Sequence, residues 1–458
     1  MRQHSHDAGE DATRSRRPKS LTRSAAPTGF LDAWNQLLGD QPCPAPRCRP
    51  GRPARVPLTQ LLPALTFHVM EGAGTLSEHF EELFQAPLAD SSWADRRARL
   101  PWDIFAELMR RMLRRRATQA KHPDAFWRGW RLVALDGTQY SLTNTPQVSR
   151  SVRKARSRRG RAGFAKLRTA VVVEVGLHNP IAAAVGREGE SEWALAQTLL
   201  DQLPAGALLL ADRLYGCGAF AAQVQAVCDR VGSHFLFRAP SVVKGRVLRQ
   251  LRDGSRILQL PLRRPKRPTP DMTSLTVREI RVQVGRPGHR PTELRLWTSL
   301  MDPGQAPALE LAGLYARRWE QELYFREVKR ELRRGDLLHS HTVETGAQEI
   351  AAIVLASAVL AVERARVANG DLPVLRVSFV KMLRVVQAMW LALDLGDGVL
   401  TEAQIKLMLK RGYERMQSHV TPVRRPRSCP RAVRQPVTGW PRLMKTHSIE
   451  APFEFTIV

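Results

Sequence analysis

The spacing of apolar and polar positions changes along the chain, and each pattern predicts a different structure. Residues 56–125 repeat apolar side chains at helical spacing, and Thr75 and Glu78 have the spacing of a capping box. Between 126 and 239, short apolar runs such as RLVAL and ALLLA are followed by helical patterns, which indicates a mixed α/β sheet. Residues 240–300 alternate with a period of two between Pro- and Gly-rich turns, which predicts a β-rich insertion.

The remaining segments are helical or lack an apolar pattern. Residues 1–55 are rich in Arg, Pro and Ser, which predicts a flexible basic arm. The chain is therefore expected to divide into this arm, a helical region (56–125), an α/β core in two parts (126–239 and 301–370) interrupted by the insertion (240–300), and a C-terminal helical region that ends in a basic tail (371–458).

Charge narrows the class of protein. The 458 residues include 71 Lys and Arg against 43 Asp and Glu, a net charge of +28, which favours a polyanionic partner. Nucleic acid and an anionic membrane surface both fit. No apolar run reaches the roughly 18–20 residues of a membrane span, and the start has no apolar core of a signal peptide. We therefore expect an intracellular nucleic-acid-binding protein without a membrane partner, in which region 56–125 contacts DNA.

Three carboxylates are candidates for chemistry. Asp136 and Asp212 each follow a buried apolar run, where α/β sheets tend to place their sites. Singly, Asp136 also fits an Asp-Gly turn, Asp212 a helix cap, and Glu322 an ion pair along its helix. Together, the three acids could hold two Mg²⁺ ions about 3.5–4 Å apart, which suits in-line displacement at phosphorus.

The segment YARRWEQELYFREVK, residues 315–329, predicts a helix with an unusual file of polar side chains. Tyr315, Arg318, Glu322 and Lys329 fall within roughly 60° on a helical wheel, between apolar neighbours. An arginine fork and a lysine in such a file could grip DNA phosphates. The alternative is a ladder of salt bridges within the helix, with Tyr315 in the core.

The spacing Tyr-x2-Arg-x3-Glu-x6-Lys resembles the YREK signature of the DDE transposases of bacterial insertion sequences, specifically the insertion-sequence-four family. ALDGT at 134–138 and LLADRLYG at 209–216 resemble that family's two Asp motifs. The resemblance covers roughly residues 56–370. It implies an RNase H-like catalytic core in which Asp136, Asp212 and Glu322 bind two Mg²⁺ ions, with Mn²⁺ as a substitute.

The same resemblance implies cut-and-paste transposition by a bacterial, nucleoid-associated cytoplasmic enzyme. Its partners would be double-stranded DNA, namely terminal inverted repeats and target DNA, bound by a homodimer on paired ends. Tyr315, Arg318 and Lys329 would contact the transposon end. Trp297 would stack on a base flipped from a hairpin intermediate, with packing in the sheet as its alternative role. Two other functions stay open: another nuclease of the same fold, and a catalytically silent DNA-binding relative.

Overall fold

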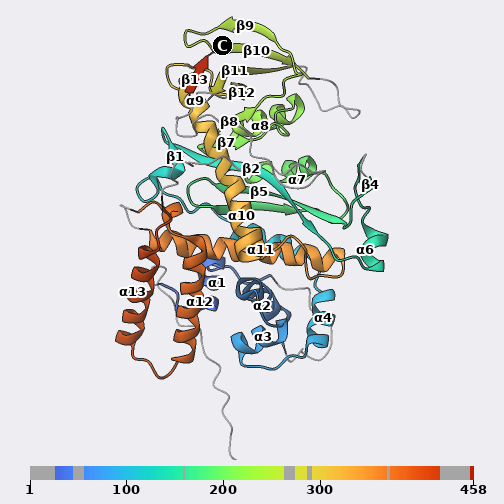
Figure 1. The fold of residues 1–458 in the computed structure, drawn as a ribbon, viewed down its shortest axis with the longest axis vertical. Coiled ribbons are helices and arrows are strands. Elements are labelled where there is room, and N and C mark those ends of the chain that lie inside the picture. The colour runs from blue at the N-terminus through green and yellow to red at the C-terminus, as the bar shows by residue number, and fades with distance from the viewer. Residues whose placement is uncertain are drawn as a thin grey trace, which may run out of the picture.

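The computed structural model describes residues 26–44, 56–157, 160–262, 274–285, 291–368, 372–422 and 454–457. Most of the predicted arm (1–25 and 45–55) and most of the basic tail (423–453) lie outside these residues. Figure 1 shows a sheet stacked above a group of helices.

One mixed sheet of eleven strands runs through the molecule in the order β6-β5-β2-β7-β8-β12-β11-β10-β9, with β1 beside β2 and β13 beside β11. The strands are β1 (Phe126–Trp127), β2 (Trp130–Ser141), β5 (Lys166–Glu174), β6 (Asn179–Val185), β7 (Ala207–Ala211), β8 (His234–Arg238), β9 (Arg246–Gln250), β10 (Arg256–Pro261), β11 (Ser274–Gly285), β12 (Thr292–Thr298) and β13 (Glu454–Ile457). A separate ribbon joins β3 (Arg156–Ser157) to β4 (Gly160–Arg161).

The core of this sheet has the RNase H-like strand order, in agreement with the fold that the family resemblance implies. Strands β2, β5 and β6 form an antiparallel meander, and β7 and β8 then add in parallel on the other side of β2. The predicted β-rich segment extends the same sheet, because β12 pairs antiparallel with β8 and continues into β11, β10 and β9. The insertion therefore widens the core sheet and does not form a separate one.

Helices cover both faces of the sheet and fill the region beneath it. Helices α7 (Glu192–Leu199) and α8 (Gly218–Val231) pack on the face that carries Val133 and Leu135, and α9 (Ala308–Tyr315) packs on the opposite face. The remaining α-helices are α1 (Phe30–Leu38), α2 (Leu58–Glu71), α3 (Leu76–Phe84), α4 (Asp90–Ala98), α5 (Trp102–Met112), α6 (Pro146–Ser151), α10 (Trp319–Arg326), α11 (Val343–Val367), α12 (Phe379–Leu395) and α13 (Glu402–Ser418). The predicted capping box of Thr75 and Glu78 is present at the start of α3.

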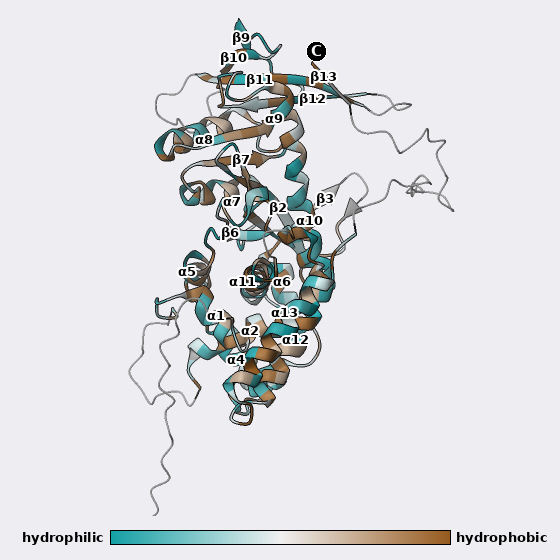
Figure 2. Ribbon diagram, turned by 90° about the vertical axis from the view of Figure 1, so that its left-hand side faces the viewer, coloured by the Kyte–Doolittle hydropathy of each residue, from teal (hydrophilic) through white to brown (hydrophobic). Residues whose placement is uncertain are grey.

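Helix α11 is the central element between the sheet and the lower helices. It is long and apolar enough to cross a membrane by composition, yet 89% of its most apolar window is buried inside the protein. Figure 2 shows it end-on between the sheet and the helices beneath it. Helix α11 is therefore a core helix of the protein.

The chain ends differ from the prediction in two places. Residues 30–38, assigned to the flexible arm, form helix α1, which buries Phe30 and Trp34 against the lower helices. Residues 454–457, assigned to the tail, form β13 along β11. The apolar residues of α1 do recur at helical spacing, a signal that the basic composition of the surrounding arm obscured, whereas β13 is recognised only through its pairing with β11. The division of the chain into domains stays a prediction.

Candidate active site

The two aspartates lie side by side because of the strand register. Strands β2 and β7 pair in parallel, and the last pair is Leu135 with Ala211, so Asp136 and Asp212 follow on neighbouring strands. Side chains alternate between the faces of a strand. Asp136 and Asp212 therefore share the face of Ala134 and Leu210, toward α9 and α10. The two aspartates therefore lie side by side as expected, although only Asp212 follows the end of its strand.

The structure also tests the two alternative local roles, a turn for Asp136 and a helix cap for Asp212. Asp136 and Gly137 do not form a turn, because β2 continues to Ser141 and Asp136 pairs with Val171. The strand thus ends five residues later than predicted, since β5 supports it on its other side. The Asp212 carboxylate accepts the Leu214 N–H at 2.7 Å, which stabilises the turn after β7, but helix α8 begins only at Gly218.

Glu322 reaches this face from a helical segment with irregular turns. Helix α9 passes through a 3₁₀ turn, η3 (Ala316–Arg318), into α10, and α10 passes into a π-helical segment, η4 (Glu327–Leu332). A 3₁₀ turn advances more degrees per residue than an α-helix and a π-helix fewer. The file on the helical wheel is therefore approximate, although its members still face the strands.

Arg318 stands between two of the candidate acids. Its Nη1 atom lies 3.5 Å from Asp136 Oδ2 and 3.6 Å from Glu322 Oε1. The side chain of Glu322 is 44% exposed, whereas that of Asp136 is 13% exposed. The guanidinium thus offsets the charge of a buried and an exposed carboxylate, and the intrahelical ion pair that the sequence left open does form.

Tyr315 and Lys329 contact strand backbone in this structure. The buried Tyr315 hydroxyl donates to the Ala211 carbonyl at 3.2 Å, directly before Asp212, and burial raises the pKa of this tyrosine to about 12. Lys329 Nζ donates to the Gln139 carbonyl at 2.7 Å and pairs with Asp336 at 3.1 Å. Both side chains line the edge of the site, and their contact with DNA stays a prediction.

Trp297 does not fit the expected stacking role. Its side chain is fully buried in the sheet core, packed with apolar residues of β7, β8 and β10, and Arg295 covers its ring at 5.7 Å. A base cannot stack on a face that neighbouring side chains already occupy. The prediction is corrected to the alternative, a tryptophan that packs the sheet.

A fourth carboxylate, Glu192, lies beside the site and was missed by the sequence analysis. It is the first residue of α7, and its Oε1 accepts the hydroxyl of the buried Tyr215 at 2.9 Å. A Cβ atom at Gly137 would approach the Glu192 carboxylate carbon to 2.1 Å, so only glycine leaves room for this side chain. Acids are common in first helical turns, and Glu192 carried no distinguishing signal.

The charges of the site favour a divalent cation. Burial raises the pKa of Asp136 to about 7, and the carboxylates of Asp212, Glu322 and Glu192 add to the rise. An oxygen-only donor set of this kind suits Mg²⁺. Among the described residues, however, no three His, Cys, Asp or Glu side chains stand close enough to hold one ion together. The acids are near enough to repel one another, and the guanidinium of Arg318 lies between two of them and offsets that repulsion.

Asp136→Asn is expected to stabilise the protein above neutral pH. The pKa of the Asp136 carboxyl rises on folding from 3.8 to about 7. Its contribution to the free energy of unfolding is therefore fully present below pH 3.8 and is lost as the pH rises through 7. The amide removes this loss, so the free energy of unfolding at pH 8 should increase by about 2–4 kcal/mol. Urea denaturation at pH 4 and pH 8 measures the difference, which should grow with pH. Asp201→Asn, at an 83% exposed side chain, is the matched control and should show no such trend.

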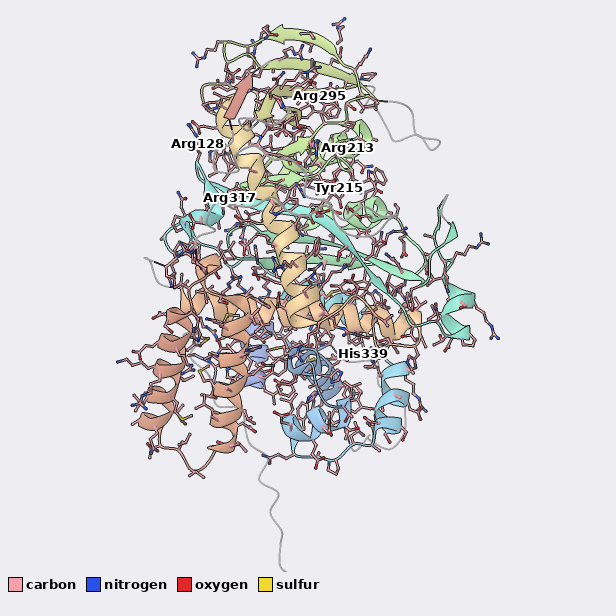
Figure 3. All side chains as sticks on the ribbon, in the orientation of Figure 1. Arg128, Arg213, Tyr215, Arg295, Arg317 and His339 are labelled. Atoms are coloured by element: carbon pink, nitrogen blue, oxygen red, sulfur yellow. The ribbon has the colours of Figure 1, made fainter. Side chains whose placement is uncertain are left out.

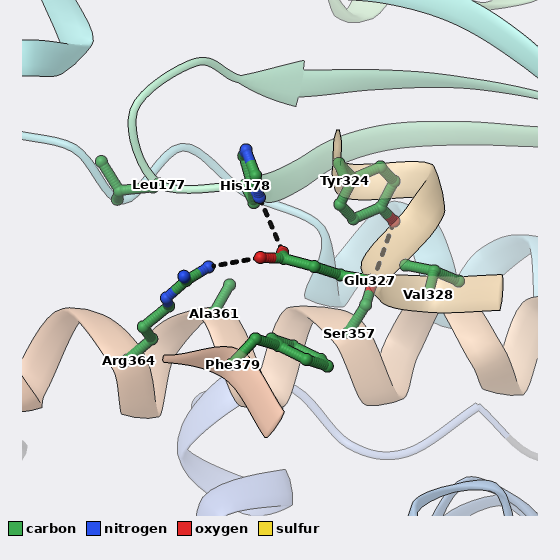
Figure 4. Close-up of a pocket in the computed structure, with 9 residues that line it drawn as sticks. All are labelled: Leu177, His178, Tyr324, Glu327, Val328, Ser357, Ala361, Arg364 and Phe379. Atoms are coloured by element: carbon green, nitrogen blue, oxygen red, sulfur yellow. Dashed lines mark hydrogen bonds and ion pairs between the residues drawn. The ribbon is translucent and has the colours of Figure 1, made fainter. Parts of the chain in front are cut away.

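Buried contacts of Glu327 fasten the YREK segment, residues 315–329, to the turn between β5 and β6 and to α11. Glu327 Oε2 lies 2.6 Å from His178 Nδ1, and Glu327 Oε1 lies 3.0 Å from Arg364 of α11 (Figure 4). Burial opposes ionisation, but Arg364 and His178 outweigh it and hold the pKa of Glu327 at about 2. Tyr324 donates to or accepts from Ser357 at 2.9 Å in the same interface. These contacts fix where Glu322, five residues before Glu327, meets the aspartates.

The chain is similar to known transposases in sequence and in structure. The chain is 29% identical over 240 residues to the transposase InsG for insertion sequence element IS4 of Escherichia coli (strain K12), and the match covers 51% of this chain and 52% of that protein. The chain thus spans about half the length of this relative. A cryo-EM structure of the piggyBac transposase synaptic complex with hairpin DNA superposes with a TM-score of 0.43 at 8% identity, over 83% of this chain and 80% of that one. Residues 127–359, which carry all three candidate acids, match the family model of the transposase DDE domain, and this chain therefore belongs to the DDE transposase family.

Proposed function

We propose that this chain is the transposase of an insertion sequence, which cuts DNA at terminal inverted repeats and joins the ends to target DNA. One observation supports this proposal above the others. The parallel register of β2 and β7 sets Asp136 beside Asp212, and Glu322 faces them across Arg318. That arrangement unites three acids from distant parts of the chain on one face.

Asp136, Asp212 and Glu322 are the residues that would hold two Mg²⁺ ions, or Mn²⁺ in their place. Bound there, the ions would activate water or a 3′-hydroxyl and stabilise the leaving oxygen. Arg318 would also bind DNA, because its guanidinium can rotate away from the two carboxylates and contact a phosphate of the incoming strand. Lys329 and Tyr315 line the same edge and would hold the transposon end.

The partner proteins and location follow from the same proposal. A second copy of the chain would bind the other end of the element, and the reaction would take place on bacterial DNA in the cytoplasm. An RNase H-like nuclease with a different substrate needs the three acids but has no use for the file of Tyr315, Arg318 and Lys329. This file therefore favours a transposase over that alternative.

A supercoiled plasmid that carries the terminal inverted repeats of the element tests the function. Purified full-length protein with Mg²⁺ should release the segment between the repeats by double-strand breaks at both ends, and EDTA should prevent it. A plasmid with scrambled repeats is the control. Cleavage at random positions would point to a general nuclease, and binding to the repeats without cleavage to a silent DNA-binding relative.

A further inference from the structure

A basic groove lies on the widened part of the sheet, next to the candidate active site. It encloses a volume of about 650 Å³, and six of its lining side chains are cationic while two are acidic. We call it the insertion groove. Its charged residues are Arg213, Arg238, Lys244, Arg256, Arg281, Arg295, Glu279 and Glu293.

The insertion groove holds more positive than negative charge on closely spaced side chains. Glu279 is 1% exposed and pairs with three guanidinium groups at once, those of Arg256, Arg281 and Arg295. Arg281 and Arg295 are direct partners across strands β11 and β12, where like charges destabilise a sheet. One carboxylate cannot balance three cations, so the floor of the groove keeps a positive excess that an anion would relieve.

The rim adds cations that have no acidic partner. Arg213, Arg238 and Lys244 are exposed, and none makes an ion pair within 4.0 Å with any residue that the structure describes. These three side chains can therefore move around a ligand without breaking an ion pair to any described residue. The ion pairs of Glu279, in contrast, hold Arg256, Arg281 and Arg295 in place.

The insertion groove reaches the turn that follows Asp212. Arg213 directly follows Asp212, and Figure 3 shows Arg213 between Tyr215, beside the site, and Arg295, in the groove. Arg238 ends β8, next to the strand that carries Asp212, and its charge acts on Tyr315. Arg213 and Arg238 therefore connect the groove to the end of β7 that Asp212 follows.

We propose that the insertion groove binds the phosphate backbone of the DNA strand adjacent to the one positioned at Asp212. Guanidinium forks match phosphate oxygens in pairs, and five of the six cations are arginines. Arg256, Arg281 and Arg295, held by Glu279, would fix the position of the strand. The exposed Arg213, Arg238 and Lys244 would then contact its phosphates. This inference rests on the proposed function, because it assumes that DNA reaches Asp212.

Binding measured without cleavage tests the proposal. A fluorescein-labelled 20-nucleotide single strand and the same sequence as a duplex are titrated with full-length protein in EDTA, and the anisotropy is followed from 50 to 300 mM NaCl. The double variant Arg238→Ala/Lys244→Ala removes two rim cations that hold no ion pair. Arg249→Ala, an exposed arginine of neighbouring β9 that does not line the groove, is the matched control.

The double variant should bind at least one of the two probes about tenfold more weakly at 100 mM NaCl. Its slope of log affinity against log salt should fall by roughly 1.4–1.8, as expected for two lost phosphate contacts. The probe that loses more identifies the form of DNA in the groove. Arg249→Ala should leave affinity and slope within about a factor of two of the unaltered protein.

Two results would overturn the proposal. Equal losses in Arg249→Ala and in the double variant would mean that the groove acts only through net charge. Unchanged affinity and salt slope of both probes in the double variant would mean that DNA does not bind in the groove. Neither result depends on plasmid cleavage. The binding experiment can therefore contradict the role of the groove while the cleavage experiment still supports the proposed function.

Discussion

Strand cleavage should fall by about 10³-fold when Asp136 is replaced by Asn, Asp212 by Asn or Glu322 by Gln. This factor corresponds to about 4 kcal/mol of transition-state stabilisation, the size expected when a ligand of a catalytic cation is lost. Each amide keeps the shape of the side chain but removes the negative charge that the cation requires. Single-turnover cleavage of plasmid carrying the terminal repeats, with Mg²⁺, measures the rates.

DNA affinity separates loss of chemistry from loss of binding in these variants. Each should bind a terminal-repeat duplex within about threefold of the unaltered protein, because the removed charge repels phosphate. Glu310→Gln, on α9 and 45% exposed, is the matched control and should cleave normally. Full cleavage by Glu322→Gln would remove Glu322 from the proposed metal site.

The second large effect is expected at Glu327, which does not contact the candidate metal site. Glu327→Gln leaves the guanidinium of Arg364, 4% exposed, without its acidic partner in the interface between the YREK segment and α11. Breaking a buried ion pair by removing one member typically costs about 3–5 kcal/mol. The free energy of unfolding at pH 7, measured by urea denaturation, should fall by about that amount.

The pH dependence gives this prediction a second readout. A carboxyl whose pKa falls on folding from 4.5 to about 2 contributes its full stability above pH 4.5 and loses it as the pH falls through 2. The unaltered protein should therefore lose stability between pH 4.5 and pH 2, and Glu327→Gln should lose about 3 kcal/mol less over this range. Glu414→Gln, at a 57% exposed side chain of α13, serves as the control. An unchanged unfolding free energy in Glu327→Gln would show that the buried pair does not hold the segment.

Sequence patterns predicted the parts of the site that depend on strong local signals. The apolar runs before Asp136 and Asp212 are buried strands, and parallel pairing alone then brings the two carboxylates together. The file of Tyr315, Arg318, Glu322 and Lys329 faces the strands, as its spacing indicates.

Features that depend on contacts between distant residues could not be predicted from the sequence. Trp297 looks the same in sequence whether it is buried or exposed, and only the pairing of β12 with β8 places it in the core. Glu192 acquires its place beside Asp136 through the Tyr215 hydroxyl and the space above Gly137. The π-helical segment η4 begins at Glu327, whose partner Arg364 lies 37 residues further along the chain, and the local sequence does not encode such a contact.

Manganese binding tests most directly whether the three acids form one metal site. Free Mn²⁺ is measured by electron paramagnetic resonance as the ion is titrated into the full-length protein bound to a terminal-repeat duplex. The unaltered protein and Glu310→Gln should bind Mn²⁺ with the same affinity, and Asp136→Asn and Glu322→Gln should each bind it at least about tenfold more weakly. Equal Mn²⁺ affinity in all four proteins would contradict a shared site of Asp136, Asp212 and Glu322.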